Sequence, residues 1–325
     1  MQKINWGIIG CGDVTESKSG PAFSKVPNSA LVAVMRRNAA KAADYAKRHH
    51  IPRWYSDAAQ LINDPGINAI YIATPPSSHE AYAVAAINAG KPVYVEKPMA
   101  LNYAAAKKMA DAAAEKNVKM VVAHYRREWP LFKKIKELLK DNVIGKTSLV
   151  HLEFHRPALT KEELAVEKNA WRVDPAVSGG GLFHDLAPHQ LDIMYWLFGA
   201  AKEISGRASN QNKLYAADDT ISGNILFKNG VAFKGNWNFN AAANKDRCEI
   251  IGSTGKLIFS FFSGNSIELV TNNQITRFEF DLLQHVQQPM IEKVVQYFRD
   301  EAVNPCTAEE GAEIMRWIGI CTNCK

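Results

Sequence analysis

Residues 4–15 read INWGIIGCGDVT, an apolar run that ends in two glycines. The run predicts a buried strand over 4–9, and the residues after the second glycine predict a helix that begins near Asp13 or Val14. Glycines between a strand and a helix let the backbone approach a pyrophosphate, whose charge then faces the helix N-terminus. We therefore expect contacts to a dinucleotide from Gly10, Gly12, Asp13 and Val14.

This glycine signature is partial, because Thr15 stands where a third small residue is usual, and an ordinary tight turn would fit it too. The following residues favour the dinucleotide. Apolar runs alternate with stretches rich in Ala and Lys, which is typical of a parallel sheet with helices on both faces. The predicted strands are 4–9, 31–35, 68–73, 92–95 and 118–122, and the predicted helices are 38–48, 79–89 and 103–116. The fold class is α/β, with a doubly wound Rossmann domain over 1–123.

The pattern changes after about residue 145. In SLVHLEFH, Val150, Leu152 and Phe154 alternate with polar residues, which indicates a half-buried antiparallel strand. Asn229-Gly230 lies between two further alternating runs and predicts a hairpin. More strands are expected at 247–252, 256–261, 266–270 and 275–280, and helices at 180–198, 289–303 and 308–320. Residues 124–325 therefore form an α+β domain with a large open, mainly antiparallel sheet, and the terminal helix is free to pack back on the first domain.

Composition excludes several classes of function. Of 325 residues, 47% are hydrophobic and 22% charged, which is near the average for soluble folded proteins. No apolar run approaches the roughly 20 residues of a membrane span, and no signal peptide is evident, so we expect a cytoplasmic protein without a membrane partner. The net charge of +6 is modest and spread out, which argues against nucleic acid. Cys321 and Cys324 form a C-x-x-C without a second pair, so we expect no metal site.

The end of the second predicted strand reads VMRRN. An acidic residue here would bind the ribose hydroxyls of NAD, but Arg36 and Arg37 occupy the position. Two guanidinium groups beside the adenosine ribose would attract a 2′-phosphate through charge-assisted hydrogen bonds. We therefore expect NADP(H) to be preferred and NAD(H) to be possible. The alternative is that both arginines are solvated and NAD binds without a carboxylate.

Two further loops follow predicted parallel strands, at the sheet edge where such folds bind ligands. The first, ATPPSSHE, offers contacts to the cofactor from Thr74, Pro75, Pro76 and His79. The second, VEKPM, places Glu96 and Lys97 at a buried strand end, where both are candidates for cofactor contact. Lys97 would also donate to a substrate hydroxyl and lower its pKa. The alternative is a structural ion pair between the two residues.

A third cluster runs from Trp171 to Asp192 and reads WRVDPAVSGGGLFHDLAPHQLD. Its three glycines permit close approach, and Asp185 and His189 then fall one helical turn apart on one face. An imidazole suits the transfer of an alcohol proton near neutral pH, and a nearby carboxylate would orient it or the substrate. By spacing alone, such a pair is more often a surface or capping arrangement, and His184 is expected to be structural.

Taken in order, G-x-G, TPPSSH, EKP, HYRR and W-R…GGG…D-x-x-x-H-x-x-D resemble the glucose–fructose oxidoreductase/inositol dehydrogenase/MocA family over essentially the whole chain. The resemblance implies a hydride transfer between nicotinamide and a sugar, cyclitol or related polyol. It implies a catalytic set of Lys97, Asp185 and His189, with His189 as general acid/base, and substrate contacts from these three and from Tyr125, Arg126, Trp171 and Arg172. It also implies a homodimer or homotetramer formed through the C-terminal sheet.

The sequence departs from the family pattern at His124, where Asn is commoner, and at Ala187, where Gly is common. Neither change removes a proposed catalytic group. Two other functions stay open: an epimerase or glycosidase that uses a tightly bound NAD for transient oxidation, and a non-catalytic module that senses nucleotides. The identity of the substrate and the direction of the reaction are not readable from these residues.

Overall fold

The computed structural model describes residues 3–322, apart from the side chain of Lys168, and the chain forms two compact units. The first takes in the described part of Met1–Tyr125 together with Leu283–Met315. The second takes in Arg126–Leu282 and the described part of Arg316–Lys325. Residues 283–315 thus return to the first unit; the sequence groups them with residues 124–325 but leaves the terminal helix free to pack back.

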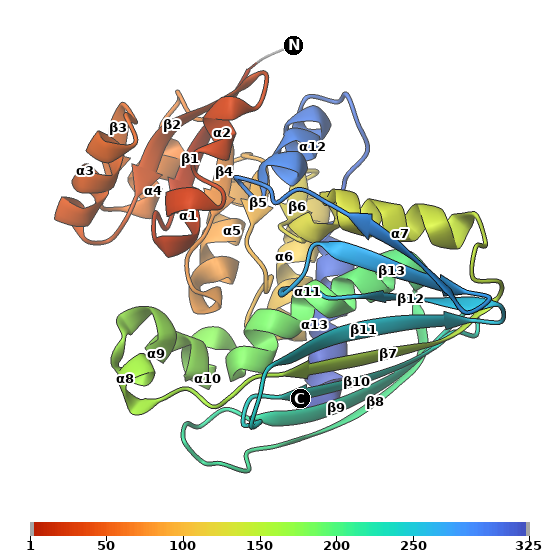
Figure 1. Ribbon diagram of the computed structural model, residues 1–325. Helices are drawn as coiled ribbons and strands as arrows, with labels where there is room; N and C mark the ends of the chain where they lie inside the picture. The colour runs from red at the N-terminus through yellow and green to blue at the C-terminus, as the bar shows by residue number, and fades with distance from the viewer. Residues whose placement is uncertain (1–2, 323–325) are drawn as a thin grey trace. The chain divides into compact units, whose positions relative to one another are not determined.

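The first unit is built on a six-stranded parallel sheet with the order β3-β2-β1-β4-β5-β6 (Figure 1). This is the strand order of a dinucleotide-binding sheet, which places the carboxyl ends of β1 and β4 side by side. Its strands are β1 (Ile4–Ile9), β2 (Ser29–Met35), β3 (Arg53–Tyr55), β4 (Ala69–Ile72), β5 (Val93–Val95) and β6 (Met120–Val122). The predicted Rossmann fold is confirmed, and only the three-residue β3 lacks an apolar run long enough to be recognised.

Helices cover both faces of this sheet, because consecutive residues of β1 point in opposite directions. The Trp6 ring packs on one face against Phe23, with ring centres 4.8 Å apart, and against Phe298, at 5.5 Å. On the other face, a Cβ at Gly7 would lie 2.7 Å from Leu61 Cδ2. The helices of this unit are α1 (Asp13–Ser17), α2 (Ala22–Lys25), α3 (Ala39–Arg48), α4 (Ala58–Asn63), α5 (His79–Asn88), α6 (Tyr103–Glu115), α12 (Gln288–Phe298), the 3₁₀ turn η1 (Pro76–Ser78) and the start of α13 (Ala308–Thr322).

The second unit contains an eight-stranded sheet of order β14-β13-β12-β11-β7-β10-β9-β8, in which only the β7–β10 pair is parallel. The predicted open, mainly antiparallel sheet is therefore confirmed. Its strands are β7 (Thr147–His155), β8 (Ala201–Ser209), β9 (Thr220–Phe227), β10 (Ala232–Asn238), β11 (Lys245–Gly252), β12 (Gly255–Phe259), β13 (Ser266–Thr271) and β14 (Gln274–Glu279). The sequence does not predict β8, because this edge strand has one neighbour and only a weak apolar alternation.

The predicted hairpin joins β9 to β10, where Gly230 has φ +89° and the Asn229 side chain accepts a hydrogen bond from the Val231 amide. A glycine in the left-handed region closes such a loop at little cost. Val150, Leu152 and Phe154 of β7 are buried as the alternation predicts. Their face of the sheet carries the core of this unit.

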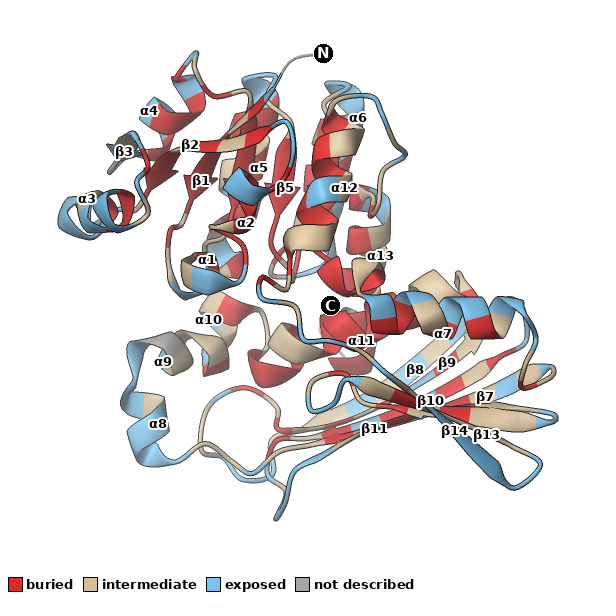
Figure 2. Ribbon diagram, turned by 45° about the horizontal axis from the view of Figure 1, so that its top comes forward, coloured by how far each residue is buried: buried red, intermediate tan, exposed pale blue. Residues whose placement is uncertain are grey.

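Helix α11 (Gly181–Phe198) packs on the apolar face of the large sheet and is buried along much of its length (Figure 2). The Phe183 and Trp237 rings meet edge to face with centres 5.0 Å apart, and Trp237 Nε1 donates to Gln190 Oε1 at 2.6 Å. These contacts hold the helix against β10. The other helical segments of this unit are α7 (Pro130–Lys140), α8 (Lys161–Ala165), α9 (Glu167–Val173), α10 (Pro175–Ser178) and the 3₁₀ turn η2 (Tyr125–Glu128), which spans the division between the units.

No helix among residues 3–322 has the length and apolar character that a membrane span requires. Cys321 is buried in α13, where burial raises the pKa of its thiol to about 12. Cys324, the other half of the C-x-x-C, lies outside the described residues.

Candidate active site

The two glycines of the opening stretch have different steric roles at the carboxyl end of β1. Gly10 has φ +97°, and a Cβ there would lie 2.7 Å from the Thr74 backbone nitrogen. Any other residue would therefore push the β1 and β4 loops apart. Gly12 precedes α1, and a Cβ placed on it would meet no atom within 4 Å. The backbone at Gly12 is thus open to a ligand, which fits the cradle that a pyrophosphate requires.

Thr15 explains how the loop keeps its shape without a third small residue. Its buried hydroxyl donates to the Gly12 carbonyl at 2.8 Å, and its own carbonyl accepts from the Tyr45 hydroxyl at 2.7 Å. Asp13 is exposed and Val14 half-buried at the start of α1. The threonine therefore braces the glycine loop through hydrogen bonds.

Arg36 and Arg37 follow β2 and differ in exposure. Arg36 is half-buried, and its Nη1 lies 3.4 Å from the Cys11 carbonyl oxygen of the glycine loop. Arg37 is exposed, and the next residue, Asn38, caps α3 by accepting from the Lys41 amide at 3.0 Å. One guanidinium group thus lies against the glycine loop, and the other faces solvent at the strand end.

The loop after β4 is braced by His79. This imidazole is fully buried, with Nε2 2.7 Å from the Thr74 carbonyl and Nδ1 3.1 Å from the Pro98 carbonyl. Burial lowers the pKa of His79, against the opposing effect of these carbonyl contacts. Ser78 Oγ donates to Thr74 Oγ1 at 2.8 Å. His79 therefore ties the Thr74-Pro75-Pro76 turn to the loop that carries Lys97.

Glu96 is turned into the core of the first unit, a feature that the sequence does not predict. Its carboxylate accepts hydrogen bonds from the Tyr71 hydroxyl, from Gln287 Nε2 at 2.5 Å and from the Lys97 backbone amide at 3.2 Å. The Tyr94 hydroxyl donates to Gln287 Oε1 at 3.2 Å. Burial, together with the Glu96 charge, raises the pKa of Tyr71 well above its usual value. The carboxylate thus anchors the backbone at Lys97.

In the second unit, Asp185 is held by Arg172. Gly179 and Gly180 precede α11 and Gly181 begins it in a sharp turn, since Gly181 has φ +78° and a Cβ on it would lie 2.4 Å from Ala217 Cβ. Asp185 then lies in the first turns of the helix, and its Oδ2 is 3.3 Å from Arg172 Nε. The Arg172 guanidinium carbon is 4.6 Å from the centre of the Trp171 ring. Three predicted site residues are therefore adjacent.

His189 lies one helical turn after Asp185 and is 4% exposed. Its ring meets the Phe262 ring edge to face, with centres 5.7 Å apart. The Asp246 carboxylate fixes the loop that carries Phe262. It accepts from the amides of Phe261 at 3.0 Å, Phe262 at 2.6 Å and Ser263 at 2.9 Å. The aromatic surface beside the imidazole is therefore rigidly placed.

The adjacent arginines of HYRR have separate roles. Arg126 is buried between Trp129 and Phe262, with its guanidinium carbon 4.2 and 4.5 Å from the ring centres, and it donates to the Phe261 carbonyl. Arg127 forms a buried bidentate pair with Asp192, whose shortest N–O distance is 2.6 Å. Neither Arg127 nor Asp192 is a sequence-predicted site residue. Together they fix α11, and with it His189, against η2.

His184 is buried with 2% exposure, and its ring occupies the space above Gly180, where a Cβ would lie 2.1 Å from it. Burial lowers the pKa of this imidazole to about 4. The expected structural role of His184 is consistent with this packing.

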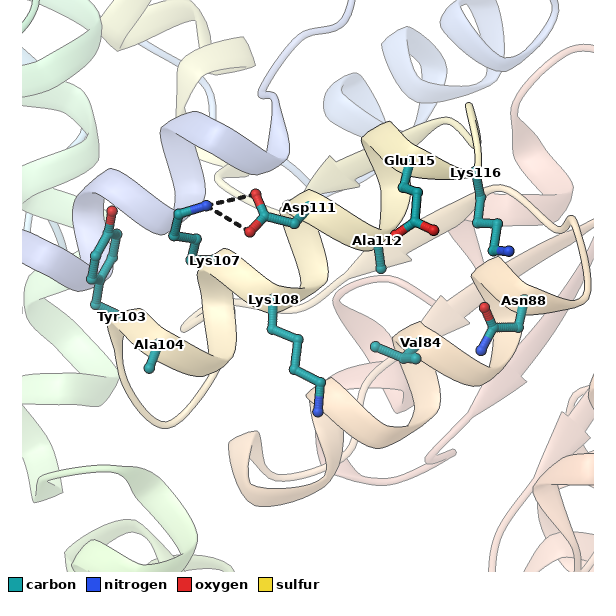
Figure 3. A pocket seen from close by; sticks show the side chains of 10 residues that line it. All are labelled: Val84, Asn88, Tyr103, Ala104, Lys107, Lys108, Asp111, Ala112, Glu115 and Lys116. Carbon is teal, nitrogen blue, oxygen red and sulfur yellow. Dashed lines mark hydrogen bonds and ion pairs between the residues drawn. The ribbon is translucent and has the colours of Figure 1, made fainter.

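A recess of about 640 Å³ lies between α5 and α6 of the first unit, and none of the predicted site residues lines it (Figure 3). Lys107 pairs there with Asp111, and Lys108 pairs with Glu80. Two of the cations that line the recess therefore already have acidic partners.

Comparisons with known proteins agree with the sheet order and the glycine loop. Residues 4–124 match the oxidoreductase family with an NAD-binding Rossmann fold, and residues 132–258 match the GFO/IDH/MocA C-terminal domain. The chain is 50% identical over 312 residues to Oxidoreductase P35 of Formosa agariphila, covering 96% of each chain. It is 28% identical over 287 residues to trans-1,2-dihydrobenzene-1,2-diol dehydrogenase of Xenopus laevis, covering 88% of this chain and 83% of the relative.

Among solved structures, levoglucosan dehydrogenase in complex with NADH and levoglucosan has the same fold, with a TM-score of 0.86 and 21% identity over 99% of this chain and 97% of that one. Both halves of the sequence and both sheets therefore lead to one assignment. The chain belongs to the Gfo/Idh/MocA family of NAD-binding oxidoreductases.

Proposed function

We propose that the protein is an NAD(P)-dependent dehydrogenase or reductase that acts on a hydroxyl or carbonyl group of a sugar, cyclitol or related polyol. One observation carries most weight: α11 presents His189 beside a fixed aromatic ring, one turn from an Asp185–Arg172 pair. This arrangement suits a polyol, because the Phe262 ring can pack on its C–H groups while Asp185 and Arg172 hydrogen-bond its hydroxyls. The relative named for a dihydrodiol also supports a substrate with neighbouring hydroxyl groups.

In the oxidative direction, the substrate carbon loses a hydride and its hydroxyl loses a proton. The nicotinamide, when bound, supplies the hydride acceptor. His189 takes the hydroxyl proton on its imidazole and returns it in the reductive direction. Lys97 donates a hydrogen bond to the same oxygen and stabilises the negative charge that develops there. Asp185, held by Arg172, accepts hydrogen bonds from the neighbouring hydroxyls and orients the sugar.

The glycine loop and the residues after β2 and β4 would hold the cofactor. The open backbone at Gly12 would receive the pyrophosphate, and the Thr74-Pro75-Pro76 turn would line the same sheet edge. Arg36 and the exposed Arg37 would bind the 2′-phosphate, so we propose a preference for NADP(H). Equal affinity for NAD and NADP would contradict this proposal, as would an Arg37→Ala variant whose preference is unchanged.

We also propose that the protein forms a homodimer or homotetramer through the sheet face turned away from α11. Cross-strand neighbours on this face include Leu149, Leu226 and Ile251, all half-buried within one chain. A row of half-buried apolar side chains on a sheet face is a suitable surface for a second copy. Sedimentation velocity of the protein and of a Leu226→Lys variant tests this, since the variant should dissociate.

A spectrophotometric screen of sugars and cyclitols with NAD and NADP tests the reaction itself. Lys97→Ala and His189→Ala should each lower kcat by orders of magnitude while the cofactor Kd changes little. Near-normal turnover in both variants would reject the roles given to these residues. Product formation without net change in nicotinamide absorbance would indicate the transient oxidation of an epimerase or glycosidase.

A further inference from the structure

Arg156 directly follows β7 in the second unit, and its backbone is fixed on both sides. Its amide donates to the Asn238 carbonyl at 2.8 Å, and its carbonyl accepts from the Ala241 amide at 3.0 Å. The guanidinium carbon lies 5.0 Å from the centre of the Phe154 ring and 5.8 Å from that of Phe262. The side chain is half-buried on these two rings. A guanidinium group placed in this way is oriented before any ligand arrives.

Within residues 3–322, no carboxylate pairs with Arg156 and none of its guanidinium nitrogens makes a hydrogen bond. The other charged groups around Phe262 are committed elsewhere. Arg126 donates a hydrogen bond to the Phe261 carbonyl, and the Asp246 carboxylate accepts hydrogen bonds from three backbone amides. On β7 itself, the Glu153 carboxylate lies 2.7 Å from Lys245 Nζ. Arg156 therefore offers a half-exposed positive charge that has no acidic partner in the described part of the chain, which suits it to bind an anionic ligand group.

The same ring that supports Arg156 also touches His189. Because both distances are measured to the centre of Phe262, the Arg156 guanidinium carbon and the His189 ring centre are at most about 11.5 Å apart. A sugar acid is about 5 Å from its reacting carbon to its carboxylate, and a hydrogen bond at each end adds about 2.8 Å. One such molecule can therefore contact both side chains.

We propose that the substrate is a sugar or polyol acid, whose carboxylate is bound by Arg156 while its hydroxyl reacts at His189. This inference rests on the proposed function for the role of His189. A single available guanidinium group balances one negative charge and matches the two oxygens of a carboxylate. A phosphate ester carries a charge nearer −2 and calls for further donors, so we assign the site to carboxylates.

The test compares substrates that differ only in the anionic group: D-glucuronate with D-glucose, D-galacturonate with D-galactose, and D-glucose 6-phosphate as the phosphate arm. The kcat/KM for each is measured with NAD and NADP in the wild type, Arg156→Gln, Arg156→Lys and Arg207→Gln. Arg207 is an exposed arginine on β8 and serves as the matched control. Calorimetric titration of each acid measures binding without requiring turnover.

We expect the wild type to favour the acids, and Arg156→Gln to lower kcat/KM and affinity for them by about 10- to 100-fold, the range of a charge-assisted hydrogen-bond pair. Values for neutral sugars should change less than threefold, and Arg156→Lys should recover part of the loss. Arg207→Gln should behave as the wild type. Thermal melts of each variant separate this loss from unfolding.

The outcomes also separate this inference from the proposed reaction. Acids that bind, lose affinity in Arg156→Gln and are not turned over would refute the reaction and support the carboxylate site. Turnover of neutral sugars or the phosphate ester equal to that of the acids, or equal losses on all substrates in Arg156→Gln, would overturn the inference. Absence of any acid binding would overturn it as well.

Discussion

Glu96 is a buried charge that depends on a residue almost two hundred positions away, and this dependence can be measured. The substitution Gln287→Leu removes the Nε2 donor, 2.5 Å from the carboxylate, and also the acceptor of the Tyr94 hydroxyl. A hydrogen bond to a charged group contributes about 1.5–3 kcal/mol, and an orphaned buried hydroxyl costs about 1 kcal/mol more. We therefore expect the free energy of unfolding of the first unit to fall by roughly 2.5–4 kcal/mol.

A second substitution isolates the contribution of the charge. In a Glu96→Gln background the acceptor at this position is neutral, so Gln287→Leu should cost about half as much, and the coupling energy should be about 1–2 kcal/mol. Differential scanning calorimetry measures the melting of the first unit, where each kcal/mol corresponds to roughly 2–4 °C. Gln296→Leu is the control, because the side chain of this half-buried glutamine of α12 accepts a hydrogen bond from Lys293 Nζ at 3.1 Å and bonds to no buried charge within residues 3–322.

The same variants test whether the anchor positions Lys97. The Lys97 amide donates to the Glu96 carboxylate, so a loosened carboxylate should shift the loop and lower kcat, with a smaller change in cofactor Kd. Additive effects of the two substitutions on melting, together with unchanged kcat in Gln287→Leu, would refute the reasoning. Equal melting temperatures for Gln287→Leu and Gln296→Leu would do so on stability alone.

Three further substitutions should change stability or cofactor binding in a direction that follows from the structure. Burial lowers the pKa of His184 to about 4 in the folded protein, against about 6.5 in the unfolded chain. About 3 kcal/mol of the stability present above pH 6.5 is therefore lost as the pH falls towards 4. His184→Leu should remove this acid sensitivity, which urea melts at a series of pH values would measure. Gly10→Ala should lower the free energy of unfolding by about 1–3 kcal/mol more than the control Gly90→Ala, because both glycines have positive φ but of the two only Gly10 lies against backbone atoms. It should also abolish NAD binding, which a titration would measure. Asp192→Ala should lower stability by about 3–5 kcal/mol by stranding Arg127, and a variant carrying Arg127→Met with Asp192→Leu should recover most of it in denaturant titrations.

The features that sequence predicts well are those encoded by neighbouring residues. The strand over 4–9, the glycine turn and the alternation in β7 each depend on residues that are close together in the sequence. The structure therefore confirms them almost to the residue. The helix that carries Asp185 and His189 has the same origin, because its apolar positions repeat at helical spacing. Local periodicity places candidate residues on elements, but it does not say which distant side chain each one contacts.

The missed residues are those whose role depends on distant partners. Nothing near Gln287 indicates a donor for Glu96, since that contact exists only because 283–315 returns to the first sheet. Asp246 likewise reads as one polar residue of a strand until the loop at 261–263 folds onto its carboxylate. Asp192 is different, because a carboxylate flanked by Leu191 and Ile193 signals a buried ion pair, and the arginines of HYRR were the available partners.

Four arginines of the second unit differ in whether their charge is already bound to another group of the protein. Arg126 fixes the loop, while Arg127 is neutralised by Asp192 and Arg172 holds Asp185, so these three guanidinium groups serve the fold or orient another side chain. Of these four, Arg156 is the one whose guanidinium group makes no described hydrogen bond or ion pair; it lies only on aromatic rings. Its replacement should leave the packing of α11 intact, because no side chain of that helix is known to depend on it. If Arg156 binds a substrate carboxylate as proposed, selectivity for acidic or neutral substrates can change at residue 156 without cost to the groups proposed to transfer the proton.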